Sequence, residues 1–204
     1  MRKLAFLATV FSILLIPSLS SAQQGDAMIG FGTTLAAGTN SCASSGFNSN
    51  CVGAEKGGLY TNISADVIFR KRIGIAFDAA WRTKQGVDDN GQYYRPLLFD
   101  FNAVYQPRIS KKVGLDLAGG VGWQSTRFYG FVPTFSCEQL NACYTSNNHF
   151  LVDVAAGLRY YAYGNFFIRP EVHFYHIMNN SDVFTNDNVI RVGASIGYTI
   201  GGPE

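Results

Sequence analysis

The sequence lacks an apolar run long enough for a membrane-spanning helix. Its longest apolar-rich segment, residues 4–16, covers 13 residues, whereas a helical span needs about 20. The sequence also lacks a large excess of charge of either sign, since it has 16 Lys and Arg and 14 Asp and Glu. Nucleic-acid-binding proteins present a basic surface, so we expect no nucleic-acid partner.

Residue patterns that carry chemistry are scarce as well. The three histidines and four cysteines form no Cys-x-x-Cys pair and no other spacing typical of a zinc site. No glycine-rich phosphate loop and no pair of catalytic carboxylates stands out. The sequence therefore predicts no metal and no other cofactor.

The N-terminal segment has the features of a secretory signal peptide. It begins MRK, continues with the apolar stretch, and ends in the small residues SSA. We predict that residues 1–22 are removed and that residues 23–204 form one domain. Because Arg2 and Lys3 leave with the signal, 14 of the 16 basic residues remain against 14 acidic ones.

The cysteines fit an exported protein, in which disulfides persist. Cys42 and Cys51 lie in one stretch rich in Ser, Asn and Gly, and Cys137 and Cys143 lie in a second polar stretch. Four cysteines allow three pairings. Proximity favours Cys42–Cys51 and Cys137–Cys143, each closing one loop.

Polar and apolar residues alternate with period two along most of the remaining chain, which indicates β-strands. We predict eight strands, at residues 26–37, 57–70, 72–84, 93–106, 113–127, 149–163, 166–178 and 188–200. They are longer than the usual 5–6 residues and suit the roughly 9–11 tilted residues that cross a bilayer.

The connections between these strands alternate in length. Those at residues 70–72, 107–112 and 163–165 are short, and those at 38–56, 85–92, 128–148 and 179–187 are longer. Short turns at one end and long loops at the other are typical of an up-and-down outer-membrane barrel.

One face of the predicted strands carries the large apolar side chains, such as Ile63, Phe101 and Ile168. An eight-stranded barrel has an interior only just wide enough for side chains to fill, so these groups must face lipid. The opposite face, which is rich in glycine, then lines the lumen. Near the long-loop end we expect an aromatic girdle of Tyr60, Trp81, Tyr93, Tyr94, Trp123, Tyr129, Phe150 and Tyr175.

The predicted lumen face also carries most of the charge on the strands. Six acids and five bases have this parity, with His173 beside them: Asp66, Arg70, Asp78, Arg82, Asp100, Asp116, Asp153, Arg159, Arg169, Glu171 and Arg191. Near-neutral pairing avoids an uncompensated buried charge. Pro170 lies among them and removes one ladder donor, so we expect a bulge or a water partner there.

Two segments resemble the last strands of a known family. The stretches AAGLRYYAYGNFFIRPEVHFYHI (155–177) and NVIRVGASIGYTIG (188–201) are similar to small OmpA-like/OmpX-like outer-membrane β-barrels, including the opacity-type surface proteins. The resemblance implies an all-β, eight-stranded antiparallel up-and-down transmembrane barrel in the bacterial outer membrane. It also implies periplasmic termini and four external loops.

Three functions are compatible with such a barrel. The first is a non-enzymatic protein with a plugged, charged lumen, which has a structural role or meets a surface ligand or a host or cell partner through its loops. The second is a small porin-like channel. The third is a lipid-modifying enzyme, but none of the three histidines lies in the His-x-Ser pair of lipid A deacylases. We favour the first, with no catalytic residue, contact with membrane lipid and a monomeric state.

Overall fold

The computed structural model describes residues 24–36, 41–42, 51–52, 54–69, 72–87, 93–129, 144–182 and 184–201. The expected signal peptide, together with Arg70, Cys137 and Cys143, lies outside these ranges. No helix within them is long and apolar enough to cross a membrane.

Eight long strands carry the fold, and the sequence predicted all of them. They are β1 (Gln24–Leu35), β4 (Tyr60–Ile68), β5 (Ile73–Arg82), β7 (Tyr93–Tyr105), β8 (Val113–Tyr129), β9 (Tyr144–Tyr163), β10 (Phe166–Ile177) and β11 (Asn188–Ile200). Shorter elements lie in the connections: β2 (Ser41–Cys42), β3 (Cys51–Val52), β6 (Gly86–Val87) and a 3₁₀ turn at Asn180–Asp182.

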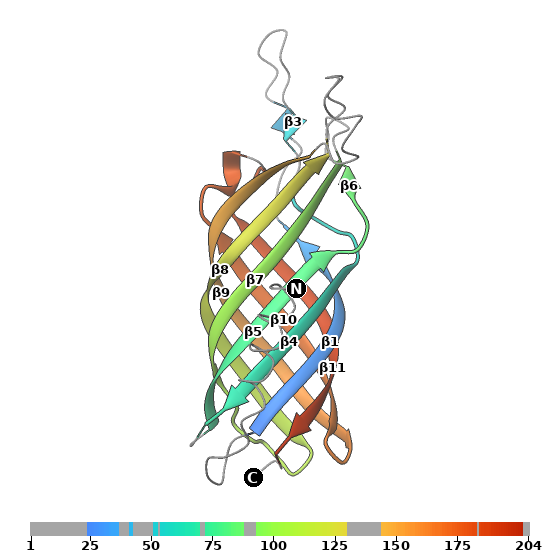
Figure 1. The fold of residues 1–204 in the computed structure, drawn as a ribbon, viewed down its shortest axis with the longest axis vertical. Coiled ribbons are helices and arrows are strands. Elements are labelled where there is room, and N and C mark those ends of the chain that lie inside the picture. The colour runs from blue at the N-terminus through green and yellow to red at the C-terminus, as the bar shows by residue number, and fades with distance from the viewer. Residues whose placement is uncertain are drawn as a thin grey trace, which may run out of the picture.

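The strands close into an antiparallel barrel. Around the ring the order is β5-β4-β1-β11-β10-β9-β8-β7, and pairing of β5 with β7 completes it. Each long strand pairs with its neighbours in the chain, and β1 pairs with β11 at the seam. In Figure 1 the strands tilt around a common axis, with β3 and β6 near the upper end. The predicted up-and-down eight-stranded barrel is confirmed.

The β8–β9 hairpin is longer than predicted. Its ladder continues to the pair Tyr129–Tyr144, whereas the sequence suggested that pairing ends near residues 127 and 149. Residues 145–148 are polar, and all of residues 144–148 are exposed, so they show no apolar alternation that could reveal a strand. The backbone ladder extends the hairpin past the barrel wall, and the Tyr129 and Tyr144 rings lie against each other at its end.

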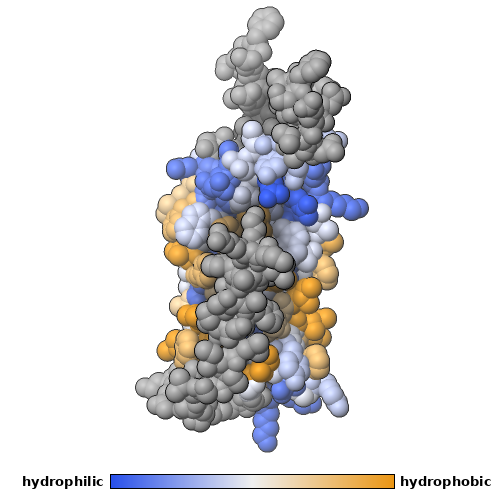
Figure 2. All heavy atoms as spheres, in the orientation of Figure 1, coloured by the Kyte–Doolittle hydropathy of each residue, from blue (hydrophilic) through white to orange (hydrophobic). Residues whose placement is uncertain are grey.

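Successive residues alternate between the lumen and the outside of the barrel. On β10, Ile168 is 45% exposed, whereas the next residue, Arg169, is 8% exposed. Figure 2 shows apolar side chains around the middle of the molecule and polar ones toward both ends. The apolar face therefore points outward, as predicted, and lipid is the environment that suits it.

The predicted bulge at Pro170 is not found. The β9–β10 register is the same on both sides of it, with Ile168 opposite Tyr160 and Glu171 opposite Gly157, and the irregularity lies at Phe166/Phe167 instead. The paired positions skip Arg169 and Pro170. The strand therefore keeps its register. Its ladder has a gap at this point because proline has no N–H to donate.

The predicted aromatic girdle needs one correction. Trp123 and Tyr93 are about half exposed, at 43% and 51%, but Tyr60, Tyr94 and Tyr175 are buried in the lumen. Each of the three has the same parity as the charged lumen face of its strand, so pleating turns it inward.

Candidate functional site

The lumen is the candidate site. Arg159 on β9 organises the part of the lumen nearest the short turns. The Arg159 guanidinium bonds to Asp116 on β8 at 2.7 Å and to Asp66 on β4 at 2.8 Å, and it also bonds to Asp26 on β1. The Gln106 amide donates a further hydrogen bond to Asp66 at 3.0 Å. One buried cation thus serves three carboxylates from three strands.

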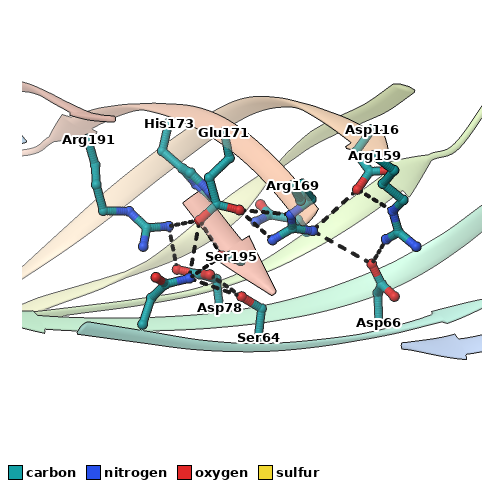
Figure 3. Close-up of polar contacts among 12 residues, drawn as sticks. Ser64, Asp66, Asp78, Asp116, Arg159, Arg169, Glu171, His173, Arg191 and Ser195 are labelled. Atoms are coloured by element: carbon teal, nitrogen blue, oxygen red, sulfur yellow. Dashed lines mark hydrogen bonds and ion pairs between the residues drawn. The ribbon is translucent and has the colours of Figure 1, made fainter. Parts of the chain in front are cut away.

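Arg169 links this cluster to the middle of the barrel (Figure 3). Its guanidinium lies 2.6 Å from Glu171 and 3.3 Å from Asp116, so it shares Asp116 with Arg159. Gly157 lies across from Glu171 on β9, and a Cβ there would stand 3.1 Å from the Arg169 stem. The glycine therefore leaves the space in which the arginine lies.

A second cluster surrounds Glu171 and Asp78. Glu171 accepts hydrogen bonds from the Asn62 amide at 3.2 Å and the Ser195 hydroxyl at 3.1 Å. Arg191 lies 2.7 Å from Asp78 and 3.9 Å from Glu171, and the Ser64 hydroxyl donates to Asp78 at 2.6 Å. These bonds join β4, β5, β10 and β11 across the lumen.

The third cluster contains no arginine. The Asn102 amide donates to both Asp100 and Asp153, and the Nδ1 atom of His173 lies 3.1 Å from Asp153. The His173 ring stacks on Tyr175 with 5.6 Å between centroids. Among the residues that the structure describes, two sets could hold a metal ion: Asp78, Glu171 and His173, and Asp100, Asp153 and His173.

An apolar layer lies on the loop side of this network. It consists of Tyr60, Ala80, Leu98, Leu151, Tyr175, Ile177 and Val189, all of which are completely buried. These residues have inward parity near the long-loop ends of their strands. We did not predict the layer, because the argument from the sequence assigned large apolar groups to the lipid face as a class.

Two segments from the connections fold against the loop-side mouth of the barrel. Glu55 is buried and accepts hydrogen bonds from the Tyr60 hydroxyl at 3.2 Å and from the Gln124 amide. Burial raises the pKa of Glu55 to about 7, although the Tyr60 and Gln124 hydrogen bonds and the charge of Arg82 partly oppose that rise. Phe184 packs on Tyr94 with ring centroids 5.2 Å apart.

Most predicted lumen residues lie together, whereas Arg82 lies apart. Joined in the three clusters are Asp66, Asp78, Asp100, Asp116, Asp153, Arg159, Arg169, Glu171, His173 and Arg191. Arg82 is half-buried at the mouth and donates to the Tyr94 hydroxyl at 2.7 Å.

The sequence missed two buried acids, Asp26 and Glu55. Asp26 is the first residue of its predicted strand, a position where a charged side chain can also be exposed to water. Glu55 lies in a connection with no periodicity. The predicted near-neutral balance is therefore wrong for the described residues. Eight acids face four arginines there: Asp26, Glu55, Asp66, Asp78, Asp100, Asp116, Asp153 and Glu171, against Arg82, Arg159, Arg169 and Arg191.

One small cavity lies among these side chains. It has a volume of about 30 Å³ and lies between Ser64, Asp78, Asn102, Arg169 and His173, among others. That volume holds a water molecule or two, since one water needs roughly 10–15 Å³ by this measure.

A closed up-and-down barrel with an apolar exterior and a charged, filled interior defines a class of protein. The fold is that of a bacterial outer-membrane β-barrel, and the outer membrane is the compartment that its apolar belt fits. It is the small-barrel fold of the OmpA-like/OmpX-like proteins that the sequence resemblance predicted.

Solved structures that share this fold include three outer-membrane proteins. The Yersinia pestis attachment invasion locus protein Ail, in complex with the heparin analogue sucrose octasulfate, has a TM-score of 0.57 and 14% identity, over 88% of this chain and 100% of that one. Neisserial surface protein A has a TM-score of 0.59 and 14% identity, over 89% and 99%. A major outer membrane protein of Thermus thermophilus has 0.60 and 10%, over 88% and 100%. No family model and no curated protein matches the sequence.

Proposed function

We propose that this protein is a non-enzymatic, monomeric outer-membrane barrel that acts at the cell surface through its loop-side end. The observation that carries the proposal is the filled lumen. Ion pairs cross it from wall to wall, and the apolar layer, from Tyr60 to Val189, lies between them and the loop-side mouth. A solute on a straight path through the barrel would meet both.

The extended β8–β9 hairpin supports a surface role. Beyond the barrel wall, Arg127 lies over the Tyr144 ring, 5.0 Å from its centroid, and Tyr129 lies 6.3 Å from Tyr144. Tyr93 on β7 pairs with Tyr129 and is half exposed. Aromatic rings beside a guanidinium suit an anionic carbohydrate or peptide, because both stacking and charge contribute.

The surroundings of two histidines support the absence of hydrolase chemistry. A serine hydrolase needs a serine within hydrogen-bond reach of a histidine base. His173 instead lies against Asp153, and His176 forms a 2.9 Å hydrogen bond with Asn188. The backbone N–H of Ser181, the serine nearest His176 in sequence, donates to Asp187.

Single-channel recording of the refolded barrel in a planar bilayer tests the closed lumen. We expect no conductance steps from protein whose folding is shown by its heat-dependent gel mobility. Reproducible steps that change size in Arg169→Ala would contradict the proposal and favour the small channel.

Binding of sucrose octasulfate tests the surface role, since the related fold of Ail is known in complex with that probe. We expect Arg127→Ala to weaken binding, whereas Arg108→Ala, near the short turns, leaves it unchanged. Equal binding by both variants would remove the hairpin from the proposal.

We also propose that residues 1–22 are removed on export. An exported protein that does not begin at Gln23 would contradict this cleavage.

A further inference from the structure

Two pairs of acids lie directly opposite each other on neighbouring strands inside the barrel. Asp26 faces Asp66 across β1 and β4, and Asp78 faces Asp100 across β5 and β7. Like charges in this position repel each other. Arg159 bonds to both members of the first pair, but Arg191 bonds only to Asp78 in the second. Among the described residues, Asp100 therefore has no ion-pair partner, whereas Asp66 in the first pair has one.

Asp100 has a second acid, Asp153, beside it. Both carboxylates are completely buried, and each keeps one oxygen with no hydrogen-bond partner among the described residues. Within the described ranges, no Arg or Lys forms an ion pair with either of them; their partners are the Asn102 amide and, for Asp153, His173. Burying two carboxylates without a cation is strongly unfavourable.

The geometry points to the missing charge: we propose that Asp100, Asp153 and His173 form a site for one divalent transition-metal ion, such as Zn²⁺, inside the lumen. One ligand atom from each residue lies within 4.8 Å of the others. Ligands about 2.0–2.2 Å from a shared zinc ion are roughly 3–4 Å apart, so small side-chain movements complete the site. Two carboxylates and a neutral imidazole then balance the charge of the ion.

The residues around the three ligands hold them in place. Asn102 donates to both carboxylates, and Tyr175 stacks against the imidazole ring. Hydrogen bonds to the carboxylates orient them as ligands, and the stacked ring limits rotation of the imidazole. The other set, Asp78 and Glu171 with His173, is less suitable, because Asp78 already binds Arg191 and Glu171 already binds Arg169.

The spacing of the sequence could not reveal this site. Its ligands come from β7, β9 and β10, at residues 100, 153 and 173, and only the closed ring brings them together. The apolar layer lies between the site and the loop-side mouth. We therefore expect the ion to enter while the barrel folds and to leave slowly afterwards.

Zinc content measures the site directly. The untagged exported protein is folded in detergent with ZnCl₂, freed of unbound metal by desalting, and analysed by mass spectrometry of the element. We expect about one zinc per folded barrel, falling at least roughly tenfold in Asp100→Asn and in His173→Gln. His176→Gln is the matched control, because His176 is on the same strand but faces outward, and it should keep its zinc.

Two results of the zinc measurement would overturn the site. One is full zinc content in folded Asp100→Asn or His173→Gln, which would assign the metal to the surface. The other is a folded wild-type barrel that holds no zinc, in which the two carboxylates share a proton instead. X-ray absorption of the zinc-loaded wild type needs no variant to fold: one imidazole with oxygen ligands supports the site, and a spectrum without imidazole contradicts it.

Discussion

Asp26 on β1 and Asp66 on β4 lie directly opposite each other, and the guanidinium of Arg159 on β9 bonds to both. The two carboxylates would repel each other in this buried position without that cation. Asp116 also bonds to Arg159, so one side chain contacts three acids, although Asp116 has Arg169 as a second partner.

Replacing Arg159 with methionine should destabilise the barrel strongly. Methionine keeps much of the volume but leaves buried carboxylates without their cation, and breaking a buried ion pair in this way costs about 3–5 kcal/mol. Urea unfolding in phospholipid vesicles, followed by the fluorescence of Trp81 and Trp123, measures the free energy of unfolding.

The double variant Arg159→Met with Asp66→Asn should recover part of the loss, because one uncompensated charge is gone. Arg127→Met is the control, since Arg127 is exposed on the hairpin. A loss below about 1 kcal/mol for Arg159→Met is what exposed ion pairs give, and it would mean that the cluster adds little to stability.

Closure of the segment around Glu55 should weaken as pH rises. The Glu55 carboxyl has a pKa of about 7 when buried, against 4.5 for an ordinary glutamate. Below about pH 4.5 both the closed and the open segment carry the proton, and closure keeps its full stability. Above this pH the open form loses the proton first, so stability falls until about pH 7, in all by roughly 3 kcal/mol.

Hydrogen exchange of the Gly57 amide, which donates to the Thr34 carbonyl at 2.7 Å, reports this opening. After correction for the intrinsic exchange rate, its protection should fall between pH 5 and pH 7. Glu55→Gln cannot ionise and should keep protection constant over this range. The same fall in the Gln variant would rule out Glu55 as the titrating group.

Two glycines on the lumen face of β8 should respond differently to a methyl group. A Cβ on Gly122 would overlap the Phe99 carbonyl oxygen and the Asp100 backbone, whereas a Cβ on Gly114 would stand 3.7 Å from Arg159. We expect Gly122→Ala to lower the free energy of unfolding by about 1–3 kcal/mol, as overpacking does at other sites. Gly114→Ala should unfold at nearly the wild-type urea concentration; equal losses would show that the close approach is not what limits Gly122.

The pairing of β2 with β3 places Cys42 directly opposite Cys51. Residues opposite each other on antiparallel strands have Cα atoms about 4.5–5.5 Å apart, within the range of a disulfide. Peptide mapping of the exported protein without reductant should therefore give linked peptides for Cys42–Cys51 and for Cys137–Cys143. Free thiols, or peptides linked across the two loops, would contradict this pairing.

The barrel was predictable because apolar and polar or small residues alternate along each strand, so that its two faces differ in character. The alternation along β10 indicates which of its faces meets lipid. A narrow lumen cannot hold all the large groups, so Ile168 and Val172 face outward and Arg169 and His173 face inward. The same parity gave the acids and arginines of the lumen, one strand at a time.

What parity could not give is the partner of each charge. Asp66 and Arg159 are 93 positions apart, and their contact depends on the ring order and on the stagger of the strands. Glu55 lies in a connection without periodicity, and the first residues of β9, from Tyr144, are exposed and show no apolar alternation. Tyr60 and Tyr175 have the correct parity for the lumen, but their size suggested the lipid face.

The bond from Arg159 to Asp66 also has a mechanical consequence. In the ring, β9 and β4 are separated by three strands on one side and three on the other, so the bond spans the diameter of the barrel. A hollow cylinder flattens under sideways pressure, whereas one tied across its middle keeps a round section. The side chains inside this barrel therefore brace its wall against the lateral pressure of the bilayer.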